Sequence, residues 1–126
     1  MIVIQLQGGL GNQMFQYAFA RILAKRNSVT LKLDKSFFET FSKEQEFTSR
    51  NFELGIFENV CKQASAKEIF KLTRLSFIDK IKKHLGFYYK SNIYSEPSLD
   101  FQSGAMSIKV PVYIKGYFQS YKYFEN

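Results

Sequence analysis

The chain has 126 residues, which is enough for one domain with a hydrophobic core, and its 45% hydrophobic and 17% aromatic content excludes a disordered chain. The formal net charge is +7. One cysteine, Cys61, excludes an internal disulfide and predicts a free buried thiol in a reducing compartment. We also expect no signal peptide, no transmembrane span of about 18 apolar residues and no metal-ligand cluster.

The first half of the chain alternates between strand and helix patterns. Residues 1–6 (MIVIQL) predict a buried strand, and residues 13–26 have the apolar spacing of a helix. Residues 29–34 (VTLKLD) predict a second strand, parallel to the first across the helical crossover. Residues 37–58 have no clear period, so we expect a long irregular loop there.

The second half begins with a basic helical segment and ends with a strand. Residues 65–85 have a helical pattern with a break near Ser76, and Ser65 and Glu68 have the spacing of a capping box. Residues 110–115 (VPVYIK) predict a third strand, after a loop with Pro97, and Gln119 starts another helix. The fold class is therefore α/β, a Rossmann-like parallel sheet with flanking helices in one domain, residues 1–126.

A glycine turn joins the first strand to the first helix. Gly8, Gly9 and Gly11 lie within four positions. A tight turn into a helix directs several backbone N–H groups and the positive end of the helix dipole toward one point, which suits a phosphate or diphosphate. A compact turn without a ligand is the alternative. Asn12 and Gln13 favour a ligand because the turn does not need their amides, although Asn12 also suits a helix cap.

A dinucleotide-binding oxidoreductase is a competing hypothesis, and the residues argue against it. Counted from Gly9, the fingerprint requires a third glycine where this chain has Met14. Asp34 closes the second strand, where such folds place a ribose-binding acid, but a turn or helix cap explains it as well. The phosphate-loop pattern also fails, because no Lys-Ser or Lys-Thr pair follows the glycines.

Two strings carry a family resemblance. GGLGNQMFQYAFA (residues 8–20) resembles the N-terminal signature of the bacterial α-1,2-fucosyltransferases, glycosyltransferase family 11, and GYFQSYKYFEN (residues 116–126) resembles a segment about a hundred residues later in those enzymes. Phe118 stands where that family often has Trp. NFELGIF (residues 51–57) and YSEP (residues 94–97) are weaker similarities.

The resemblance implies transfer of L-fucose from GDP-fucose to the 2-hydroxyl of a terminal galactose, with inversion and without a metal or other cofactor. It implies the N-terminal half of a two-domain GT-B fold and a role in surface glycan or O-antigen synthesis. The expected donor-binding residues are Gly9, Gly11, Asn12 and Gln13. The expected acceptor contacts follow the third strand at the ligand edge of a parallel sheet, and they are Gln119, Ser120 and Tyr121. Ser120 equally suits a helix start, and the sequence names no catalytic base.

One departure bears on activity. The family's His-x-Arg-x-Gly-Asp donor motif is absent, because Leu85 and Gly86 follow the one histidine, His84, and no arginine follows Arg74. We therefore expect a domain truncated before the C-terminal donor-binding domain, inactive or nearly so by itself. A non-catalytic carbohydrate- or nucleotide-binding remnant is the alternative.

The positive charge is concentrated in one segment. Residues 62–90 contain eight basic and two acidic side chains, a net of +6. Residues 65–85 place apolar residues on one side and lysines elsewhere, as in a surface helix packed on the sheet or one that contacts an anionic membrane or lipid-linked acceptor. No nucleic-acid module surrounds these lysines, so we expect no nucleic-acid partner. The expected location is cytoplasmic, with peripheral attachment to the inner face of the bacterial membrane.

Overall fold

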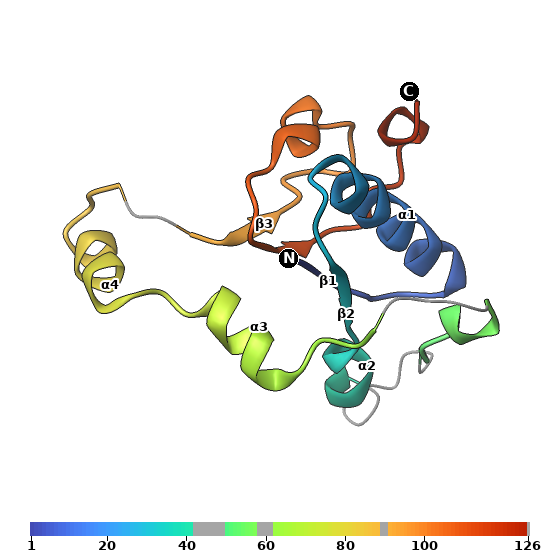
Figure 1. The fold of residues 1–126 in the computed structure, drawn as a ribbon, viewed down its shortest axis with the longest axis horizontal. Coiled ribbons are helices and arrows are strands. Elements are labelled where there is room, and N and C mark those ends of the chain that lie inside the picture. The colour runs from blue at the N-terminus through green and yellow to red at the C-terminus, as the bar shows by residue number, and fades with distance from the viewer. Residues whose placement is uncertain (42–49, 58–61, 89–90, 126) are drawn as a thin grey trace.

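The computed structural model describes residues 1–41, 50–57, 62–88 and 91–125 (Figure 1). Four parallel strands form one sheet in the order β2-β1-β4-β3, namely β1 (Ile2–Gln5), β2 (Leu31–Asp34), β3 (Ile93–Ser95) and β4 (Val112–Lys115). Ile2 of β1 lies opposite Leu31 on one side and Val112 on the other. The predicted α/β class with a Rossmann-like parallel sheet is thus confirmed.

The connections between the strands are helical. They comprise the α-helices α1 (Leu10–Arg26), α2 (Ser36–Phe41), α3 (Ala66–Thr73) and α4 (Phe77–His84), and the short 3-10 turns η1 (Leu54–Ile56), η2 (Ser103–Ser107) and η3 (Tyr121–Tyr123). Helix α1 connects β1 to β2 and covers one face of the sheet, while α3 packs on the opposite face. Helices α3 and α4, with the C-cap Leu85, form an arm (residues 66–85, the α3–α4 arm), and α4 stands away from the sheet at its end (Figure 1). Among the described residues, no helix is both long and apolar enough to cross a bilayer.

The larger core lies between α1 and the sheet. It is built from alternate strand residues, because successive side chains of a strand point to opposite faces. Those that face α1 are fully or almost fully buried, and they pack against Phe19, Ala20 and Leu23 of the helix. These strand residues are Ile2, Ile4, Leu31, Leu33, Val112 and Ile114.

The opposite face combines a smaller apolar cluster with a buried polar pair. Val3 and Tyr113 pack against Ala64 and Leu72, which docks α3 on the sheet. The Tyr113 hydroxyl donates a 2.5 Å hydrogen bond to the carboxylate of Asp34, and both residues are 2% exposed. Burial, followed by the bond to this carboxylate, raises the pKa of Tyr113.

One helix boundary differs from the sequence-based prediction, and two predicted helix features are confirmed. Helix α1 begins at Leu10 rather than at residue 13, because the glycine turn itself supplies the first helical residues. The predicted break near Ser76 is confirmed: Ser76 caps the start of α4, so residues 65–85 form two helices. The capping box of Ser65 and Glu68 is also confirmed.

The last third of the chain holds one strand that we did not predict and one helix that is shorter than predicted. Strand β3 lies in a stretch where we predicted no strand, and its three residues carry no readable period. The helix predicted from Gln119 is a single 3-10 turn, η3. Cys61 lies outside the described residues, so its predicted burial stays a prediction.

Candidate functional site at the carboxyl edge of the sheet

The glycine turn leaves the first turn of α1 without a side-chain cap. Gly8 has a φ of +76°, and a Cβ atom there would lie 2.3 Å from the Asn12 amide nitrogen, so only glycine fits without rearrangement. Gly9 is the N-cap residue, no side chain accepts a capping hydrogen bond there, and the first turn has no acidic residue. The positive end of the α1 dipole is therefore available to an anion. Asn12 is not the cap.

An arginine that the sequence analysis missed lies beside this turn. A Cβ atom on Gly9 would be 3.5 Å from Nη1 of Arg50, which places the guanidinium against the glycine backbone. A Cβ atom on Gly11, by contrast, would meet nothing within 4 Å. The packing of the described residues therefore does not require glycine at position 11.

Gln13 points into the protein rather than toward solvent. It is fully buried, and its amide nitrogen donates to the carbonyl oxygens of Gly8 (3.0 Å) and Asn51 (2.8 Å). Its side-chain oxygen accepts from the backbone N–H of Glu53 at 2.9 Å. Gln13 thus ties the glycine turn to the segment that carries Arg50, and it has no donor hydrogen left for a ligand.

The second motif segment follows β4 and is held in shape by a carboxylate. Gly116 has a φ of +151°, and a Cβ atom there would lie 2.5 Å from the Glu96 side chain. The Glu96 carboxylate accepts hydrogen bonds from the backbone N–H groups of Tyr117 (2.7 Å) and Phe118 (3.1 Å). Glu96 directly follows β3, so one side chain links the ends of two neighbouring strands.

The two motif segments meet at the carboxyl edge of the sheet. The Gln119 amide nitrogen donates a 2.5 Å hydrogen bond to the side-chain oxygen of Asn12, across 107 positions of sequence. Phe118, the residue before Gln119, stacks its ring on Phe19 of α1, with ring centroids 3.9 Å apart and planes 8° from parallel. The aromatic stack is fully buried, so it fixes the turn and the loop relative to each other.

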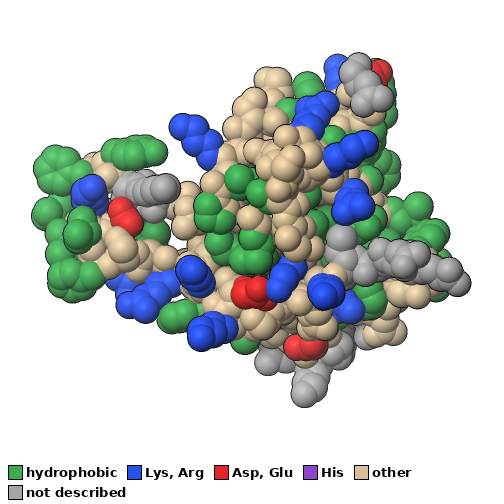
Figure 2. Space-filling view, viewed as in Figure 1, with side chains coloured by type: hydrophobic (Ala, Val, Ile, Leu, Met, Phe, Trp, Pro, Cys, Tyr) green, Lys and Arg blue, Asp and Glu red, His purple; other side chains and the backbone are tan. Residues whose placement is uncertain are grey.

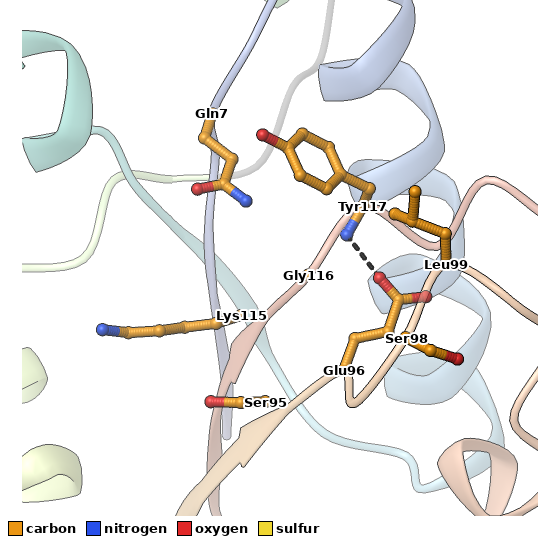
Figure 3. A pocket seen from close by; sticks show the side chains of 8 residues that line it. All are labelled: Gln7, Ser95, Glu96, Ser98, Leu99, Lys115, Gly116 and Tyr117. Atoms are coloured by element: carbon orange, nitrogen blue, oxygen red, sulfur yellow. Dashed lines mark hydrogen bonds between the residues drawn. The ribbon is translucent and has the colours of Figure 1, made fainter.

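A pocket of about 310 Å³ opens at the same edge (Figure 3). In the figure, the side chains of Gln7 and Tyr117 extend toward each other from the ends of β1 and β4, and the Glu96 carboxylate points to the Tyr117 nitrogen. The lining is mixed polar and apolar, and it consists of Gln7, Ser95, Glu96, Ser98, Leu99, Lys115, Gly116 and Tyr117. Hydroxyl, amide and aromatic groups in a pocket of this size suit a small polar ligand such as a sugar unit.

Three other residues that the sequence analysis singled out, namely Ser120, Tyr121 and Asp34, do not line this pocket. Ser120 begins η3 through its backbone, because its carbonyl oxygen accepts from the N–H of Tyr123. Tyr121 is 65% exposed and does not line the pocket. The Asp34 carboxylate accepts from the Ser36 backbone N–H at 2.9 Å as well as from Tyr113, so it caps a turn at the start of α2.

Two tyrosines near the loop that follows β4 have raised pKa values. Burial, followed by the charges of Tyr123 and Glu96, raises the pKa of Tyr94, and burial also raises the pKa of Tyr123. Within the described ranges, no three His, Cys, Asp or Glu side chains are grouped so that they could hold a metal ion.

Comparison with known proteins adds one relative. A stretch of 57 residues is 51% identical to the O-antigen biosynthesis glycosyltransferase WbnK of Escherichia coli. The match covers 44% of this chain but 18% of that protein's length, so it supports a relationship to glycosyltransferases and not a specific sugar. No protein-family profile and no solved structure matches the chain.

Proposed function

We propose that this chain is the N-terminal α/β domain of an inverting glycosyltransferase. The enzyme would transfer L-fucose from GDP-fucose to the 2-hydroxyl of a galactose-terminated glycan, in surface glycan or O-antigen synthesis. A lipid-linked acceptor at the inner face of the membrane is part of this proposal. The observation that carries it is the hydrogen bond between Asn12 and Gln119, because it joins the two segments that resemble fucosyltransferases at the ligand edge of the sheet.

The donor diphosphate is assigned to the start of α1. Transfer breaks the bond between the fucose anomeric carbon and the diphosphate, so negative charge accumulates on the leaving group and must be stabilised. The uncapped first turn offers backbone N–H groups from Leu10, Gly11 and Asn12, and the Arg50 guanidinium adds a full positive charge beside Gly9. Gly11 has no Cβ atom and lies in this first turn, so its backbone can approach a phosphate closely.

The acceptor galactose is assigned to the pocket between Gln7, Glu96 and Tyr117. The amide and hydroxyl groups of these walls suit the hydroxyls of a sugar, and the Tyr117 ring suits its apolar face. Glu96 acts here as a positioning residue, because its carboxylate is occupied by the backbone N–H groups of Tyr117 and Phe118. The hydrogen bond from Gln119 to Asn12 joins the loop after β4 to the glycine turn, and this supports acceptor and donor sites that lie side by side, as in-line transfer requires.

Gln13 and the predicted acceptor contacts Ser120 and Tyr121 take different parts in this proposal. Gln13 positions the turn and the Arg50 segment rather than touching the donor, because its amide is used within the protein. Ser120 and Tyr121 follow Gln119, and a longer glycan would extend over the exposed Tyr121 beyond its terminal sugar.

A sugar-transfer assay on the complete gene product tests the proposal. The reading frame should be followed past the codon of Asn126, and its product incubated with a galactoside and either GDP-fucose, GDP-mannose or UDP-galactose. We expect transfer from GDP-fucose alone. Arg50→Gln should lower kcat/KM by about 10- to 100-fold, less than an enclosed oxyanion donor would, because Arg50 is exposed.

The matched control is Arg21→Gln, because Arg21 is an exposed arginine on α1, three turns away from the glycine turn. It removes the same charge and should leave kcat/KM unchanged. Transfer of another sugar would overturn the fucose assignment. Binding of GDP-fucose without transfer by a complete product would instead support a non-catalytic binding remnant.

A further inference from the structure

The α3–α4 arm exposes an apolar face that the described part of the chain does not cover. In α4, four large apolar residues follow helical spacing and share an arc of about 100°, since successive residues are rotated by about 100°. They are 44% to 76% exposed, and no residue of α4 is buried: Phe77, Ile78, Ile81 and Leu85, the last as the C-cap. By the same spacing, Lys80 and Lys82 flank this arc. Figure 2 shows green apolar side chains crowded over this arm, with lysines and arginines beside them.

Helix α3 continues the same surface toward the sheet. It buries Leu72 against the sheet, whereas Phe70 is 60% exposed. Between the two helices lies a groove of about 500 Å³, lined by two phenylalanines, a serine and three cations but no carboxylate: Lys67, Phe70, Lys71, Arg74, Ser76 and Phe77. The Arg74 guanidinium lies 5.6 Å from the centre of the Phe70 ring. Cationic side chains therefore lie next to the exposed phenylalanines of this groove.

The acidic residues of the arm do not neutralise this surface. Glu68 forms an ion pair with Lys32 on the sheet side of α3, and it also completes the capping box. Asp79 lies, by helical spacing, on the side of α4 opposite the apolar arc. The exposed side that remains is apolar at its centre and positive at its borders.

We propose that the α3–α4 arm is a docking surface for an anionic lipid bilayer. An amphipathic helix lies in the interface with its apolar face in the acyl boundary and its cations among the headgroups. The arc from Phe77 to Leu85 supplies the apolar face, and the lysines of the arm and Arg74 supply the cations. A neutral protein partner would explain the apolar arc but not the three cations of the groove. The inference stands independently of transferase activity.

A fluorescence measurement on vesicles tests the proposal directly. The chain has no tryptophan, so Phe77→Trp introduces a single reporter on the arc. With vesicles of phosphatidylcholine and phosphatidylglycerol, its emission should shift to shorter wavelength, and with phosphatidylcholine alone it should not. Phe57→Trp is the control, because Phe57 follows η1, which lies across the molecule from α4 (Figure 1) and should show no shift.

Charge variants test the electrostatic part. A cation near an anionic membrane contributes about 1 kcal/mol, or about fivefold in partitioning, so Lys80→Gln with Lys82→Gln should weaken vesicle binding by about 25-fold. Lys25→Gln with Arg26→Gln removes the same charge from the end of α1 and should change binding little. Raising NaCl from about 0.1 M to about 1 M should also release the protein, because the Debye length falls from about 10 to about 3 Å.

Three results would overturn the proposal. The first is an absence of binding to anionic vesicles, and the second is equal binding to neutral ones. The third is unchanged vesicle binding when Ile78→Ser and Ile81→Ser replace two of the four apolar residues of the arc; because neither residue is buried, these changes should not unfold the sheet. If sedimentation instead shows a dimer that the isoleucine variant abolishes, and vesicles do not bind, the arm is a self-association surface.

Discussion

Replacing Glu96 with alanine removes the carboxylate that holds the loop after β4. Two backbone N–H groups, of Tyr117 at 2.7 Å and Phe118 at 3.1 Å, lose their acceptor. A hydrogen bond to a charged group contributes about 1.5–3 kcal/mol, so the pair is worth up to about 6 kcal/mol. The pocket beside Glu96 is open to water, and water can replace part of the lost hydrogen bonding. We therefore expect the free energy of unfolding to fall by about 2–4 kcal/mol.

Urea unfolding followed by circular dichroism measures this change. Glu96→Gln keeps one carbonyl acceptor but removes the charge, so it should lose about half as much as Glu96→Ala. Glu125→Ala removes an exposed glutamate near the end of the described chain and should stay within about 0.5 kcal/mol of the parent. A loss within the same limit for Glu96→Ala, or equal losses for Glu96→Gln and Glu96→Ala, would contradict the stabilising role of the Glu96 carboxylate.

Three further predictions concern buried or paired polar groups. Gln13→Ala leaves three backbone partners unsatisfied, so urea unfolding should show a loss of about 2–4 kcal/mol, and a loss below about 1 kcal/mol would contradict the buried network. Tyr113→Phe removes one of two described hydrogen bonds to buried Asp34 and should reduce the unfolding free energy by about 1.5–3 kcal/mol, whereas an equally stable variant would contradict the contact. Hydrogen bonds from Lys32, and then from Ser65, lower the pKa of Glu68 to about 2. Because the pKa of Glu68 is lower in the folded state, its carboxylate stabilises the fold at pH values above its unfolded-state pKa of about 4.5, and this stabilisation is lost as the pH falls toward about 2. The melting temperature of the parent should therefore exceed that of Glu68→Gln above about pH 4.5, and the difference should disappear between about pH 4.5 and about pH 2; a difference that does not change with pH would contradict this prediction.

Strong periodic patterns made most of the sheet predictable. Strands β1, β2 and β4 were predicted because their alternate or continuous apolar residues are buried on a sheet that is covered on both faces. Strand β3 was not, because Ile93–Ser95 is only three residues long and its burial is partial. The break between α3 and α4 was predictable because Ser76 supplies an N-cap signal within an otherwise helical pattern.

The site was predictable only where its residues follow a strand. Asn12 was expected after the glycine turn and Gln119 beyond the third predicted strand, but their contact depends on β1 lying next to β4, which the sequence does not encode locally. Arg50 was missed because it lies in an irregular segment and reaches the turn only through the anchoring of Asn51 and Glu53 by Gln13. A weak similarity, YSEP, was the one signal for Glu96.

The most direct test of the central claim is an amide NMR titration of this chain with GDP-fucose. We expect the backbone signals of Gly9, Gly11 and Asn12 to shift together with that of Gln119, because the turn and the loop are joined by the hydrogen bond between Asn12 and Gln119. Millimolar affinity, equivalent to about −4 kcal/mol, is enough for detection. Signals of α4 should stay in place, and UDP-galactose should cause smaller shifts. If these four amides do not move, or if the shifts lie elsewhere, the carboxyl edge of this sheet is not the nucleotide-sugar site.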